Sequence, residues 1–346
     1  PDPAILAAIE RLSRDPAVSV RYRTMQNLSV LHRRSPETFW RIVEERCENE
    51  QERAVLKALC YNLEDLISHD RERVERALEV LVRRVIIPDD LGDPLEPLIH
   101  LLVRLDLIDQ DARAGRVTER FLAEPSRYAG SLLCATSAAL SLLRSSGGGC
   151  TDRVVGWLER AVAAVADGVR AVLPPPGCGP IQDERVRVSL RSLYETIDRI
   201  VLHLGAILDE TPDPAGASPA YRQKGAFYFT VKPLLEKISS FAQDPENRLL
   251  FAPTAPWFVR LLNSVLAYDP EGVIRMAADL AWASRPAGCH PDLLASDDLV
   301  SLVETALADH PSTVAAGDLL RLLDLFAEGQ DPRALRRVWR LDEVYG

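Results

Sequence analysis

The stretch "DPAVSVRYRTMQNLSVL" at residues 15–31 decides the fold, because its spacing of residue types recurs far along the chain. It opens with Asp15-Pro16 and places Val20 and Arg21 at the fifth and sixth positions after the Asp. An Asp at the N-cap and a Pro in the first turn both stabilise the start of a helix. Taken alone, the stretch predicts a capped helix.

The same spacing appears in "DPEGVIRMAADLAW" at 269–282, where Asp269-Pro270 is followed by Ile274 and Arg275. Weaker echoes are "DPRALRRVWR" at 331–340 and "DRERVERAL" at 70–78. Units that recur along a chain, each unable to bury its apolar face alone, are typical of helical-repeat proteins.

Helical periodicity fills most of the remaining sequence. Apolar residues at i, i+3 and i+4 give one face each in 35–50, 51–68 and 70–86. Further helices are predicted near 94–106, 110–123, 126–144, 151–173, 182–209, 220–243, 255–267, 270–284, 296–309, 313–327 and 331–343. Alternating strand patterns are missing, so the sequence predicts an all-α fold, an α-α superhelix.

The stretch "LPPPGCGP" at 173–180 interrupts this rhythm, because consecutive prolines remove backbone donors and impose extended backbone. It predicts an N-terminal helical lobe over 1–173, a linker at 174–180 and a C-terminal lobe over 181–346. A loop protruding from one continuous array is the alternative.

The Asp-Pro…Val/Ile-Arg units resemble the first helix of HEAT repeats. The resemblance implies a degenerate α-solenoid in which the Arg pairs with an acidic residue of a neighbouring repeat. It makes these residues structural repeat positions: Asp15, Pro16, Val20, Arg21, Asp269, Pro270, Ile274 and Arg275. Unrelated helices that share a common cap are the alternative.

The tail, which contains "LLDLF" and "RRVWRLDEVY", resembles the C-terminal helical region of large bacterial STAND-type NTPases of anti-phage defence. That resemblance implies a sensor region that follows a nucleotide-binding core. The chain has no G-x-x-x-x-G-K-[ST] loop and begins at Pro1 without a Met, so we expect any NTPase or other upstream domain to precede it.

Composition narrows the class of protein. The chain has 346 residues, 47% of them hydrophobic, and a net charge of −10. No segment is strongly basic, which disfavours nucleic acid as a partner. The sequence shows neither a signal peptide nor an apolar run of membrane-spanning length. The six cysteines stand singly, which favours reduced thiols in a cytoplasmic protein over disulfides or a zinc site.

One segment, "YRQKGAFYFTVKP" at 221–233, combines aromatic and basic residues as a partner-binding surface does. The candidate contacts are Arg222, Lys224, Phe227, Tyr228 and Lys232. The alternative is a helix with an aromatic core face and a basic outer face.

Catalytic chemistry has one weak candidate, the neighbours Cys289 and His290. Adjacent residues rarely reach the geometry of a nucleophile and its base, so an ordinary loop is expected, with no catalytic residue, cofactor or metal. The sequence therefore predicts a non-enzymatic helical-repeat module that binds another protein, as a scaffold or recognition region. The alternatives are a nucleic-acid-binding module and an enzyme that uses Cys289 and His290.

Overall fold

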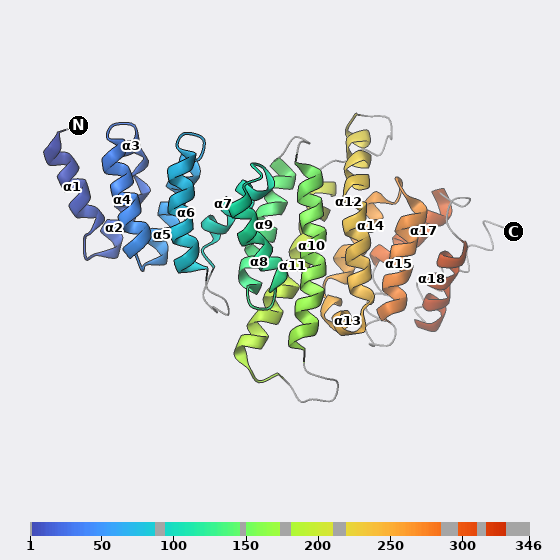
Figure 1. Cartoon of the computed structure of the whole chain (residues 1–346). Coiled ribbons are helices and arrows are strands. Elements are labelled where there is room, and N and C mark those ends of the chain that lie inside the picture. Colours follow the sequence, from blue (N-terminus) through green and yellow to red (C-terminus); the bar gives the residue numbers. More distant parts are fainter. Residues whose placement is uncertain are drawn as a thin grey trace. The chain divides into compact units, whose positions relative to one another are not determined.

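A computed structural model describes residues 2–86, 94–145, 150–173, 181–209, 219–284, 297–309 and 316–329. Within these ranges every regular element is a helix, which confirms the all-α prediction (Figure 1). None of the helices described is long and apolar enough to span a bilayer.

The chain divides into two compact units, Pro1–Phe121 and Leu122–Gly346. In the first unit, α1, α4 and α6 contact one another in that order and form one layer, while α2, α5 and α7 form a second layer. The helices of this unit are α1 (Pro3–Ser13), α2 (Val18–Gln26), α3 (Ser29–His32), α4 (Pro36–Asn49), α5 (Arg53–Leu66), α6 (Arg71–Val85) and α7 (Glu96–Leu107). Helix α8 (Ala112–Ala123) follows and runs across the division.

The second unit repeats this arrangement. Helices α9, α11, α14 and α17 contact in order as one layer, and α10, α12, α15 and α18 as the other. The bounds are α9 (Ala129–Ser145), α10 (Thr151–Val172), α11 (Glu184–Asp209), α12 (Pro219–Gln243), α13 (Pro245–Phe251), α14 (Ala255–Val265), α15 (Pro270–Ser284), α17 (Asp297–Asp309) and α18 (Ala316–Gly329). Each unit is therefore a two-layered stack of helices, as a helical-repeat fold requires.

The predicted apolar faces are the buried faces. In α4, Phe39, Ile42, Val43 and Cys47 are all buried, and α5 buries Val55, Leu56, Leu59, Cys60, Leu63 and Leu66. Residues at i, i+3 and i+4 share one side of a helix, so each such face reaches both neighbours in the stack. The thiols of Cys47, Cys60 and Cys150 are free.

Two helices lie outside the predicted helix ranges, α1 and α13. Each begins with an Asp-Pro whose carboxylate accepts a backbone hydrogen bond, at 2.8 Å from Ala4 N to Asp2 and 2.9 Å from Glu246 N to Asp244. The predicted helix 331–343 and the linker 174–180 lie outside the described residues. Helices α10 and α11, which flank that linker, pack together in one unit. A lobe boundary at the linker stays a prediction.

The two Asp-Pro motifs differ at the start of their helices. Asp269 accepts a hydrogen bond from Gly272 N at 3.1 Å, and α15 begins at Pro270, as predicted. For the first motif the prediction of a capping Asp15 is wrong, because α2 begins at Val18 with Ala17 as its N-cap. The carbonyl oxygens of Asp15 and Pro16 instead accept from Arg21 Nη1, at 2.9 and 3.1 Å, which keeps both residues outside the helix.

Candidate functional site

The predicted aromatic-basic cluster lies on α12, and two of its members are engaged inside the second unit. Tyr228 is buried, and its hydroxyl donates to Asp269 Oδ2 at 2.8 Å. Lys232 Nζ lies 2.7 Å from the same oxygen. Both side chains therefore bind α12 to the start of α15.

Asp269 is the centre of this contact. Burial by itself raises the pKa of its carboxyl, but the hydrogen bonds from Lys232, Tyr228 and Gly272 N outweigh burial and bring the pKa below its ordinary value. For Tyr228, burial and the neighbouring Asp269 both raise the pKa of the hydroxyl, so it stays protonated as a donor. The charge of Asp269 is thus held in the folded protein.

The other members of the cluster are less engaged. Lys224 and Phe227 are half-buried, and burial lowers the pKa of Lys224 although Asp209 opposes the shift. The side chain of Arg222 lies outside what the structure describes. Phe229, which is not one of the predicted contacts, is an exposed aromatic residue of this segment. A partner-binding role for the cluster stays a prediction.

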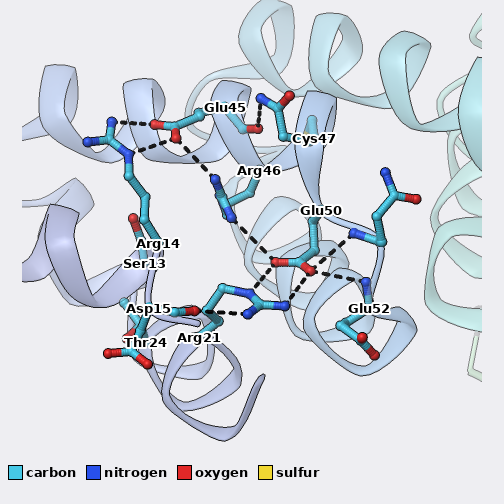
Figure 2. Close-up of polar contacts among 12 residues, drawn as sticks. Ser13, Arg14, Asp15, Arg21, Thr24, Glu45, Arg46, Cys47, Glu50 and Glu52 are labelled. Atoms are coloured by element: carbon cyan, nitrogen blue, oxygen red, sulfur yellow. Dashed lines mark hydrogen bonds and ion pairs between the residues drawn. The ribbon is translucent and has the colours of Figure 1, made fainter. Parts of the chain in front are cut away.

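Arg21 makes the matching contact in the first unit. Its Nε and Nη2 bind the two carboxylate oxygens of Glu50 at 2.8 and 3.0 Å (Figure 2). Arg46 Nη1 lies 3.5 Å from Glu50, and the backbone N–H groups of Gln51 and Glu52 donate to Glu50 Oε1. We call α1 and α2 the first helix pair, and α4 and α5 the second. Arg21 of α2 thereby binds the end of α4, in the next helix pair.

Glu50 is almost fully enclosed, with 2% of its side chain exposed. Burial alone raises the pKa of its carboxyl, but the hydrogen bonds from Arg21 and from the backbone outweigh that effect, and the pKa lies below its ordinary value. A buried charge of this kind is stable only while its partner is present.

A large open apolar hollow lies along α1, α2 and α3, and we call it the end groove. It has a volume of about 880 Å³ and is lined by residues of α1, α2 and α3 and of the turns that follow α2 and α3. Its apolar lining consists of Ile5, Leu6, Ile9, Leu12, Val20, Leu28, Val30 and Leu31. Ile5, Leu12 and Val30 are 56%, 45% and 66% exposed, which is unusual for large apolar side chains that lie together.

Polar residues also line the end groove, namely Ser19, Arg23, Thr24, Asn27 and Arg34. Neither Arg23 nor Arg34 pairs with a carboxylate among the described residues; Arg23 donates only to the amide oxygen of Gln26, at 3.1 Å. The sequence analysis missed this surface because it predicted no helix before residue 15. The signal was present as Asp2-Pro3 followed by the stripe Ile5, Ile9 and Leu12.

Two smaller hollows lie elsewhere in the first unit. One, between α2 and α5, measures about 490 Å³ and is lined by polar and aromatic residues that include Tyr22, Lys57 and Tyr61. The other, among α6, α7 and α8, measures about 310 Å³. Its Arg113 already pairs with Glu79 at 2.9 Å, so part of its charge is neutralised within the protein.

The described ranges offer few side chains suited to metal binding or to nucleophilic catalysis. They contain no group of three or more His, Cys, Asp or Glu side chains able to hold a metal ion. Burial raises the pKa of the Cys47 thiol to about 12, and it raises that of Cys60 as well, so neither is a nucleophile at neutral pH. Cys289 and His290 lie outside the described residues, and the absence of enzymatic activity stays a prediction.

Comparisons with known proteins give weak likenesses. No family model and no curated protein matches the chain. A chain from a structure on a conserved phosphorylation switch, which controls the interaction between cadherin and beta-catenin, is 14% identical with a TM-score of 0.27, and the match covers 95% of this chain and 77% of that one. The TSC2 N-terminus is 13% identical with a TM-score of 0.22, and the match covers 94% of this chain and 100% of that one. Likenesses this weak carry no argument about what the protein binds.

Proposed function

We propose that the protein is a non-enzymatic helical-repeat module that binds another protein, with the end groove as its principal contact surface. The observation that carries this proposal is the cluster of exposed Ile5, Leu12 and Val30 in a hollow of about 880 Å³. Contiguous apolar surface is costly in water, and on folded proteins it commonly marks an interaction site.

The character of the end groove favours a protein over a nucleic acid. Within the described part of the chain its lining is mainly aliphatic, with two arginines and no aromatic side chain on which a base could stack. Binding to nucleic acid depends on many phosphate contacts, and the chain carries a net charge of −10.

The finer assignment is a recognition region of a larger bacterial defence-type protein, with further domains upstream. It rests on the resemblance of the tail to STAND-type NTPases alone. Nothing among the comparisons supports that link.

Site-specific photo-crosslinking tests the proposal in cells that naturally make the protein. A photo-reactive residue replaces Val30 in the end groove, Phe229 on α12 or Glu72 on α6, all of which are exposed. We expect a protein adduct from position 30 and none from position 72. Adducts from position 229 alone would move the binding surface to the aromatic-basic cluster. Absence of protein adducts from all three positions would overturn protein binding, and adducts with nucleic acid would favour the alternative.

A further inference from the structure

We infer that the end groove takes an amphipathic helix of another protein, with an apolar face and carboxylates that pair with Arg23 and Arg34. This inference rests on the proposed function and names the chemistry of the partner. It is carried by three features of the described residues: the position of the groove in the helix stack, the composition of the stack's internal contacts, and the two unpaired arginines.

The end groove occupies the place of a helix-packing face. Thr24 and Asn27 stand at the ninth and twelfth positions of the first motif, and both line the groove. Ala278 and Ala281 stand at the same positions of the second motif, and both are completely buried. Helix α15 packs between α12 and α18, whereas α2 contacts α5 on one side of its layer only. By motif position, the face of α2 that lines the groove therefore corresponds to a face of α15 that is buried in the second unit.

Contacts between successive helix pairs in the first unit share one composition. Each joins apolar side chains and is bordered by pairs between arginine and a carboxylate. Between the first and second pairs these are Arg14–Glu45, Arg21–Glu50 and Arg41–Glu10. Beyond the second pair, Arg73 meets Glu37 at 3.0 Å, and Arg104 meets Glu64 at 3.5 Å.

The end groove has the apolar residues and the arginines of such a contact but lacks the carboxylates. Among the residues that the structure describes, Arg23 and Arg34 line it, and no acidic residue does. A helix that completes the contact must therefore bring Glu or Asp beside its apolar stripe. A second copy docking through the same face would bring two more arginines to the interface and no carboxylate from the described lining, and like charges at an interface oppose association.

The experiment uses two helical probe peptides of about 18 residues, long enough for roughly five turns. Both carry one leucine stripe, which is flanked by Glu in the acidic probe and by Lys in the basic probe. We expect the purified protein to bind the acidic probe in fluorescence anisotropy and to bind the basic probe at least about tenfold more weakly. Rising salt should narrow this difference, because exposed pairs are screened.

Charge exchange makes the test specific. The double variant Arg23→Glu/Arg34→Glu should reverse the preference, so that the basic probe binds about tenfold more tightly than the acidic one. The matched control Arg11→Glu/Arg33→Glu changes the net charge equally with exposed arginines outside the groove lining, and it should keep the original preference. Val30→Glu should abolish binding of both probes, whereas Tyr61→Glu on α5 should not. Circular dichroism verifies that each variant stays folded.

The outcomes separate this inference from the proposed function. Equal binding of both probes, or no change with Arg23→Glu/Arg34→Glu, would overturn the acidic helix as occupant. Self-association that Val30→Glu abolishes would overturn it in favour of a second copy. Crosslinks from position 30 to a partner without an acidic amphipathic helix would overturn this inference but would still support protein binding. Absence of protein crosslinks from all three positions would overturn both the inference and the proposed function.

Discussion

The two Asp-Pro motifs differ in which residue holds the helix stack together. In the first motif, Arg21 binds the buried Glu50, while the Asp15 side chain accepts an exposed hydrogen bond from Ala17 N, at 2.8 Å. In the second motif, the Asp269 side chain is the centre, with 16% of its surface exposed. Arg275 makes one pair with Glu236, in which both side chains are close to half-exposed.

The difference shows that the two motifs share a position in the helix stack but do not share the same interaction. Both motifs connect one helix pair to another, but the central carboxylate is the buried Glu50 in one case and the partly buried Asp269 in the other. Exposed ion pairs contribute little to stability, whereas the loss of one partner of a buried charge is strongly destabilising. Equivalent substitutions in the two motifs should therefore have unequal effects.

The largest effect is expected from Arg21→Leu, which leaves Glu50 buried without its main partner. It should lower the free energy of unfolding of the first unit by about 3 kcal/mol. Native-state hydrogen exchange of α2 and α4, resolved by mass spectrometry, measures this loss. The matched variant Arg275→Leu should change exchange in α12 and α15 by less than about 0.5 kcal/mol. Equal effects of the two variants would refute the comparison.

Asp269→Ala should come next, at about 2 kcal/mol, because it removes a helix cap and leaves the Tyr228 hydroxyl and Lys232 without their acceptor. The counterpart Asp15→Ala loses one exposed hydrogen bond and should cost about 0.5 kcal/mol. Urea unfolding followed by circular dichroism compares the two. A larger loss from Asp15→Ala would mean that the first motif also depends on its Asp.

Gly272 allows the Asp269 carboxylate to approach the helix, since a Cβ at this position would lie 2.3 Å from Oδ2. Gly272→Ala should therefore destabilise the second unit by about 1 kcal/mol, despite the better helix propensity of Ala. Gly156→Ala in α10 meets no atom within 4 Å and should stabilise by up to about 1 kcal/mol. In the Asp269→Ala background the penalty of Gly272→Ala should disappear, and its persistence would contradict the proposed clash.

The smallest effect concerns pH. The pKa values of Glu50 and Asp269 lie below their ordinary values in the folded protein, so the unfolded chain binds protons first as the pH falls. Their contribution to stability is complete above the unfolded pKa values of about 4 and is lost as the pH falls through the folded values. Stability measured by urea unfolding should be flat from about pH 7 to 5 and then fall. Glu50→Gln should flatten the fall in the first unit and leave that of the second unchanged.

Much of the fold was predictable from the sequence, because helix formation depends on patterns within one turn or two. The stripes of α4 and α5 and the cap at Asp269 both follow from local spacing. The start of α2 was not predictable, since the carbonyls of Asp15 and Pro16 are turned toward Arg21 by a contact that also requires Glu50.

The candidate site was the least predictable part. Composition pointed to the aromatic-basic cluster on α12, but Tyr228 and Lys232 bind Asp269, which lies 41 residues from Tyr228 along the chain. The end groove had a sequence signal in α1, but an apolar stripe looks the same whether a neighbour covers it or not. The exposure of the apolar stripe of α1 depends on how α1, α2 and α3 pack together in the folded unit.

The sequence by itself determined that the chain is helical and that its Asp-Pro units repeat, because caps and apolar periodicity act over a few residues. Only the tertiary structure decided which charges are buried and which apolar face stays open. Those properties depend on which helices become neighbours, and residues as distant as Arg21 and Glu50 meet only when the stack has formed. The unpaired arginines beside the open groove are therefore a property of the fold, and they give the proposed partner its acidic character.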